Sequence, residues 1–224
     1  MQYHISTGLI IKHFAENCGC PLCTIEKIVE TNICRELLAD GCMDDSVRME
    51  VNAKGFCLKH FEQLYEMPSK LGLSLQMTTR MNTLFKNVLA KPKSASDAKK
   101  RGLKLQEEQN KCIVCDYTEA EMVKYYKTIA QLYSNEDQFR EMFSKSEGFC
   151  LKHYSKLLQY TNYAGFSSKK YIEALYQVED SRLKKSVELL EAFSNRHDYR
   201  NLGKPLGEAT TALPRIKTDL FGKK

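Results

Sequence analysis

The stretch Gly-Phe-Cys-Leu-Lys-His (GFCLKH) occurs twice in this chain, at residues 55–60 and 148–153. Each copy follows a CxxC motif, which reads CPLC at residues 20–23 and CIVC at residues 112–115. The interval between CxxC and the next GFCLKH cysteine is 33 residues in the first pair and 34 in the second. Because both the motifs and their spacing recur, the sequence predicts an internal duplication.

The cysteines and histidines of these motifs are typical zinc ligands. Zinc prefers four sulfur and nitrogen ligands in a tetrahedron, and a CxxC turn brings two thiolates to one ion. Residues three apart on a helix share a face, so the cysteine and histidine of GFCLKH can bind the same ion. We therefore predict two Cys3His zinc sites, with one Zn²⁺ in each repeat: Cys20, Cys23, Cys57 and His60 in the first, and Cys112, Cys115, Cys150 and His153 in the second.

Apolar residues recur at helical intervals through most of the chain, so we expect an all-α fold. One stripe comprises Met122, Tyr125, Tyr126, Ile129, Leu132 and Tyr133, and a later one Ile172, Leu175, Tyr176, Leu183, Val187 and Leu190. We expect helical zinc-binding units over residues 1–90 and 105–200, joined by an exposed basic linker over residues 91–104. Residues 201–224 are rich in proline and glycine and are expected to form an irregular tail.

The composition favours a folded cytosolic protein. The 224 residues are 42% hydrophobic and 28% charged, and no run of about 20 apolar residues is present that could cross a bilayer. The N-terminal residues also lack the pattern of a secretory signal, so we expect a cytoplasmic location without membrane insertion. Nine cysteines in a reducing compartment favour metal binding over disulfides.

Several alternatives remain open at the two sites. An iron–sulfur cluster can also use cysteine-rich ligand sets with one histidine, and buried thiols can simply pack in a core. Cys18 can replace Cys20 as a ligand, although the repeat favours Cys20. Lys59 and Lys152 stand between the ligands of each GFCLKH, where they either offset the negative charge of the site or remain in solvent.

With these motifs in hand, the chain resembles a family of uncharacterised bacterial proteins found chiefly in clostridia and their relatives, catalogued as a domain of unknown function. The resemblance rests on CPLC at 20–23, CIVC at 112–115 and the two GFCLKH copies, and it extends to DYRNLGKPLGEA at 198–209. It implies paired metal sites and brings no enzymatic mechanism with it.

Four protein ligands close the zinc shell, which favours structural sites in a non-enzymatic binding or scaffolding protein with a protein partner. The chain also lacks HExxH, GxSxG and phosphate-binding glycine motifs. A nucleic-acid-binding protein is one alternative, suggested by two groups of basic residues: Lys91, Lys93, Lys99, Lys100 and Arg101, and Lys169, Lys170, Arg182, Lys184 and Lys185. A redox or metal sensor is another, in which the spare thiol of Cys18 makes the first site the more oxidisable one.

Overall fold

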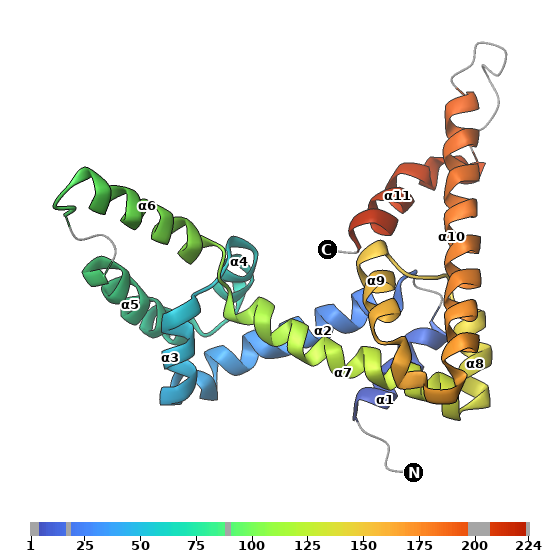
Figure 1. The fold of residues 1–224 in the computed structure, drawn as a ribbon, viewed down its shortest axis with the longest axis horizontal. Coiled ribbons are helices and arrows are strands. Elements are labelled where there is room, and N and C mark those ends of the chain that lie inside the picture. The colour runs from blue at the N-terminus through green and yellow to red at the C-terminus, as the bar shows by residue number, and fades with distance from the viewer. Residues whose placement is uncertain (1–4, 17–18, 88–90, 197–206, 223–224) are drawn as a thin grey trace. The chain divides into compact units, whose positions relative to one another are not determined.

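The computed structural model describes residues 5–16, 19–87, 91–196 and 207–222, and these residues contain helices and no strand, as predicted (Figure 1). The helices begin with α1 (Ile5–Ala15), α2 (Pro21–Leu38), α3 (Asp45–Lys54), α4 (Leu58–Glu66), α5 (Lys70–Asn87) and α6 (Ala95–Gln109). They continue with α7 (Ile113–Asn135), α8 (Asp137–Ser144), α9 (Leu151–Gln159), α10 (Ser168–Arg196) and α11 (Ala212–Phe221). Short 3-10 turns occupy Asp40–Cys42 (η1), Thr161–Ser167 (η2) and Gly207–Thr211 (η4).

The chain divides into two compact units, and the division passes through α2 and α7. Unit 1 comprises residues 1–27 and 122–224, and unit 2 comprises residues 28–121. This division does not coincide with the boundary predicted at residues 91–104, because each unit combines segments from both predicted repeats.

Unit 1 has a core of aromatic side chains. Phe14 of α1 contacts Phe139 and Phe143 of α8, with ring centroids 5.2 and 5.8 Å apart, and also contacts Phe149. Tyr171 on α10 completes the cluster. The predicted stripe on α7 is largely confirmed, since Met122, Tyr125, Tyr126, Ile129 and Tyr133 are buried. Helices α9, α10 and α11 contact one another.

The stripe predicted on α10 is confirmed only in part. Leu175 is fully buried, but Ile172, Tyr176 and Val187 are about half exposed. The other residues of the buried face include Tyr171, Val178, Arg182, Ser186 and Leu189. A buried ion pair explains the difference, because Arg182 and Ser186 both contact the buried Asp219 of α11. Polar residues therefore occupy part of the inner face, and apolar periodicity alone identifies this face only in part.

Unit 2 is built on α3 and α5, which pack together and also contact η1. Val51, Leu64 and Leu73 are buried there, and Gln76 donates to the carbonyl oxygen of Leu37 at 2.7 Å. Among the described helices, none has the length and apolar character needed to cross a membrane.

Two segments expected to lack regular structure are helical. A largely exposed helix, α6, occupies most of the predicted linker. Ser94 caps this helix by accepting a hydrogen bond from the amide of Asp97. The predicted irregular tail instead forms η4 and α11 over its described part, while residues 201–206 lie outside the described residues. Pro214 stands in the first turn of α11, where its missing amide hydrogen is tolerated.

Candidate metal centres

The eight predicted ligands gather into two groups, but not in the predicted combinations. Cluster A contains Cys20, Cys23, Cys150 and His153, all in unit 1, and cluster B contains Cys57, His60, Cys112 and Cys115, all in unit 2. Within each cluster, the candidate ligand atoms all lie within 4.8 Å of one another. Each CxxC thus meets the GFCLKH of the other repeat, and the predicted grouping within one repeat is corrected.

The two main helices between each CxxC and the next GFCLKH are unequal in length. The 18 residues of α2 advance about 27 Å, at about 1.5 Å per residue, whereas the 10 residues of α3 advance only about 15 Å. The same inequality holds between α7, with 23 residues, and α8, with 8.

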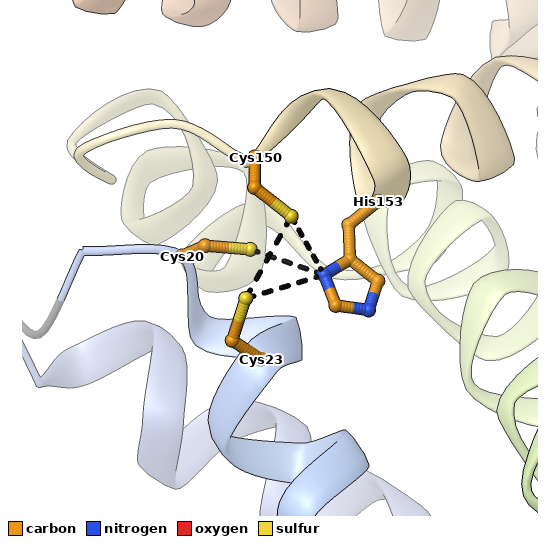
Figure 2. Close-up of side chains that lie close together, drawn as sticks. All are labelled: Cys20, Cys23, Cys150 and His153. Atoms are coloured by element: carbon orange, nitrogen blue, oxygen red, sulfur yellow. Dashed lines mark hydrogen bonds between the residues drawn. The ribbon is translucent and has the colours of Figure 1, made fainter. Parts of the chain in front are cut away.

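In cluster A, the imidazole of His153 faces three sulfurs (Figure 2). Its Nδ1 lies 3.4 Å from Sγ of Cys20, 3.5 Å from Sγ of Cys23 and 3.2 Å from Sγ of Cys150. The sulfurs of Cys23 and Cys150 are 3.7 Å apart. Four potential ligand atoms therefore surround one small volume.

Cluster B repeats this arrangement. Nδ1 of His60 lies 3.2 Å from Sγ of Cys57, 3.2 Å from Sγ of Cys112 and 3.4 Å from Sγ of Cys115. The sulfurs of Cys57 and Cys115 are 3.9 Å apart.

These separations match the edges of a tetrahedron around one metal ion. With Zn–S near 2.3 Å and Zn–N near 2.0–2.1 Å, a regular tetrahedron places two sulfurs about 3.8 Å apart and sulfur and nitrogen about 3.5 Å apart. A disulfide requires about 2.05 Å between its sulfurs, which is far shorter than either measured sulfur pair. Both clusters can therefore hold a single tetrahedral ion.

The local backbone presents the GFCLKH ligands in the same way in both copies. Cys57 and Cys150 are the N-cap residues of α4 and α9, so each histidine falls in the first helical turn. Gly55 and Gly148 have φ values of +67° and +87°, a region that disfavours residues with a Cβ. Glycine at this position therefore lets the chain turn sharply into the ligand helix.

One backbone hydrogen bond distinguishes the two clusters. The amide of Ile113 donates to the carbonyl oxygen of Gly55 at 3.1 Å, which joins the CxxC and GFCLKH segments of cluster B. Pro21 occupies the corresponding place in the other CxxC and has no amide hydrogen to donate. Cluster A instead lies under the end of α11, where a Cβ on Gly222 would lie 3.2 Å from Sγ of Cys23.

Two glutamates that the sequence analysis missed stand behind the histidines. Nε2 of His60 lies 2.8 Å from Oε1 of Glu30, and Nε2 of His153 lies 3.4 Å from Oε2 of Glu26. If Nδ1 binds a metal, Nε2 keeps its proton and can donate to the carboxylate, which orients the ring. In the sequence, the one indication of their role is that both glutamates follow Cys23 on α2. This indication pointed to no particular histidine while the ligands were grouped within one repeat.

The lysines of the two GFCLKH copies pair with these same glutamates. Lys59 contacts Glu30, and Lys152 lies 2.5 Å from Oε1 of Glu26. Neither of the two predicted roles describes them fully, because each lysine bonds the carboxylate behind the histidine.

An arginine supports each glycine turn. Arg80 donates to the carbonyl oxygen of Asn52 at 2.6 Å and pairs with Glu108 at 2.5 Å. Arg182 donates to the carbonyl oxygen of Glu147 at 2.8 Å and pairs with Asp219 at 2.5 Å.

Hydrogen bonds within the clusters favour a protonated histidine and, in cluster B, an ionised cysteine beside it. Burial opposes ionisation of His60, yet hydrogen bonds with Cys112 and Glu30 raise the pKa of its imidazole to about 9. Burial likewise opposes the thiolate of Cys112, but the hydrogen bond from His60 helps bring its pKa down to about 6. For His153, hydrogen bonds with Cys150 and Cys23 outweigh burial and raise the pKa to about 11. A cation entering either cluster would displace such protons.

The clusters differ most in solvent exposure. All four residues of cluster A are buried, with at most 4% of any side chain exposed. In cluster B, His60 and Cys112 are buried, but Cys57 is partly exposed and Cys115 is exposed.

The cysteines outside the clusters fall into three cases. Cys34 is buried. Cys42 is partly exposed in η1 and donates to the carbonyl oxygen of Ala39. Cys18, the proposed substitute ligand, lies outside the described residues.

Comparison with known proteins gives two matches. The model of the Family of unknown function (DUF6062) matches residues 1–224. The chain is also 22% identical over 197 residues to the "Uncharacterized 23.9 kDa protein in xynA 3'region" of Caldicellulosiruptor sp. (strain Rt8B.4), which covers 86% of this chain and 89% of that protein. No solved structure matches the chain.

Proposed function

Because the chain belongs to the Family of unknown function (DUF6062), as its motifs predicted, we propose a function from its two clusters alone. Each cluster binds one Zn²⁺ ion, and the two ions stabilise the fold. The protein is cytosolic and non-enzymatic, and it binds or scaffolds a protein partner. Each zinc has four protein ligands and no open position for a substrate, which is typical of a structural site.

The convergence of remote segments is the observation that carries this proposal. In cluster A, Cys20 and His153 are 133 positions apart, and in cluster B, His60 and Cys112 are 52 apart. An ion at each cluster therefore closes a long loop of the chain. Structural zinc contributes about 10–16 kcal/mol of apparent binding free energy, which is comparable to the whole stability of a typical domain, about 5–15 kcal/mol.

The ligand set favours zinc over an iron–sulfur cluster. An iron–sulfur cluster spreads its protein ligands over more than one iron, whereas each set here fits the coordination tetrahedron of a single ion. Three thiolates and one imidazole also match the soft and borderline ligands that zinc prefers.

The nucleic-acid alternative receives little support from the basic residues that suggested it. Arg182 is buried and paired with Asp219, so it is not available to a phosphate. Arg101 pairs with Asp97 at 3.0 Å, and Lys184 pairs with Asp180 at 2.7 Å. Surface pairs of this kind are ordinary features of a solvated helix.

Native mass spectrometry with elemental analysis of the full chain, purified without added metal, tests the proposal. We expect two zinc ions per chain, and one in either Cys57→Ser or Cys150→Ser. Cys42→Ser is the matched control, because this cysteine belongs to neither cluster and should keep both ions. Absence of metal, or iron accompanied by sulfide, would refute the proposal.

A further inference from the structure

The two clusters present unequal access to solvent, although their ligands are the same. Every ligand of cluster A is buried, and the backbone of Gly222 covers the sulfurs of Cys23 and Cys150. Cluster B contains an exposed cysteine, Cys115, and a partly exposed one, Cys57. A dissolved reagent can therefore reach thiolates in cluster B that have no accessible counterpart in cluster A.

We propose that cluster B is an oxidation site for peroxides, in which Cys115 reacts first, Cys57 closes a disulfide with it, and the zinc of cluster B is released while cluster A keeps its ion. This inference rests on the proposed function, since it requires zinc in both clusters. The neighbouring sulfurs of Cys57 and Cys115 are 3.9 Å apart and need to approach by about 1.9 Å to form a bond of about 2.05 Å.

The reaction is a two-electron oxidation of two thiolates by one hydrogen peroxide. The Cys115 thiolate attacks one peroxide oxygen, the O–O bond breaks, and hydroxide leaves, so that Cys115 becomes a sulfenic acid. The Cys57 thiolate then attacks the Cys115 sulfur, the S–O bond breaks, and a second hydroxide leaves. Both thiolate ligands are consumed in the disulfide.

Loss of these two ligands leaves only His60 and Cys112 for the ion. Two ligands do not satisfy the four-coordinate shell of a structural zinc, so the ion leaves. Cys112 is a less suitable second thiol than Cys57, because Cys112 is buried whereas Cys57 is partly exposed.

The site of oxidation is thus the reverse of the one expected from the spare thiol of Cys18. That expectation counted cysteines along the sequence, whereas access to an oxidant depends on which sulfurs face solvent. Cluster B contains the later CxxC motif. Its two more exposed cysteines are Cys115 of that motif and Cys57.

The test is a peroxide time course on the zinc-loaded full chain, with a chromogenic zinc chelator reporting release. We expect one equivalent of zinc to leave at least about tenfold faster than the second, because only cluster B has accessible thiolates. Peptide mapping at the end of the fast phase should find a Cys57–Cys115 disulfide and reduced Cys20, Cys23 and Cys150.

Cys42→Ser removes a partly exposed thiol that belongs to neither cluster, and should leave both phases unchanged. Release of both ions at one rate, earlier loss from cluster A, or a Cys112–Cys115 disulfide would overturn the inference while leaving the two zinc sites intact. A chain that holds no zinc before peroxide is added would instead overturn the proposed function.

Discussion

Cluster A and cluster B share one ligand set and one GFCLKH motif, yet their surroundings differ. In unit 1, Phe149 of the motif is fully buried in the aromatic core beside Phe143, and α11 covers the neighbouring cysteines. In unit 2, the corresponding Phe56 is only partly buried, and Leu58 is 74% exposed. The comparison teaches that identical ligand motifs yield a closed or an open centre according to the elements that cover them.

Pairs of substitutions test the separation of the two clusters with the largest expected effect. Cys23→Ser with Cys150→Ser alters cluster A twice, so this variant should keep one zinc. Cys23→Ser with Cys57→Ser alters both clusters and should lose both ions, together with the about 10–16 kcal/mol that each structural zinc contributes. Native mass spectrometry counts the ions, and the opposite result would restore the grouping within one repeat.

Substitutions of the arginines that support the glycine turns should change the free energy of unfolding by an intermediate amount. They test whether unit 1 encloses its glycine turn more tightly than unit 2. Arg182→Met leaves the buried carboxylate of Asp219 without its closest cation, and loss of one partner from a buried pair costs about 3–5 kcal/mol. Arg80→Met should cost less, about 1.5–3 kcal/mol, because Glu108 keeps Lys111 at 2.8 Å.

Urea unfolding of the zinc-loaded proteins measures both changes. The control is Arg48→Met, whose exposed pair with Asp45 should contribute less than about 1 kcal/mol. A larger loss for Arg80→Met than for Arg182→Met would contradict the tighter enclosure of unit 1.

The glutamates behind the histidines give the smallest expected effect. Glu30 is the stronger partner, because its carboxylate is buried and 2.8 Å from Nε2 of His60. Burial opposes its ionisation, but His60 and Lys59 hold its pKa at about 2. Glu30→Gln should weaken zinc binding at cluster B by about 10–100-fold, the usual effect of removing such a partner.

Glu26→Gln should weaken cluster A less, because Glu26 is partly exposed and 3.4 Å from Nε2 of His153. Competition with a chelator of known affinity measures each site in a variant whose other cluster is already disabled. Equal losses at both sites would show that the shorter contact to Glu30 has no energetic consequence.

Much of this protein follows from intervals along the chain. Apolar periodicity predicted an all-helical fold, and the stripe on α7 from Met122 to Tyr133 is largely buried as expected. The spacing of CxxC and of the cysteine and histidine in GFCLKH places two ligands within one helical turn, so each pair could be recognised from the sequence. The resemblance to an uncharacterised clostridial-type family was also confirmed.

The tertiary structure alone decided which pairs meet and which of the ligand cysteines are exposed to solvent. Residues three apart are held together by the helix itself, but the meeting of Cys20 with His153 depends on the lengths of the intervening helices and on their packing. The same holds for Glu30 behind His60 and for Asp219 beneath Arg182, where the partners come from different helices. Local geometry is encoded in short intervals, whereas contacts between distant segments arise only when the whole chain packs.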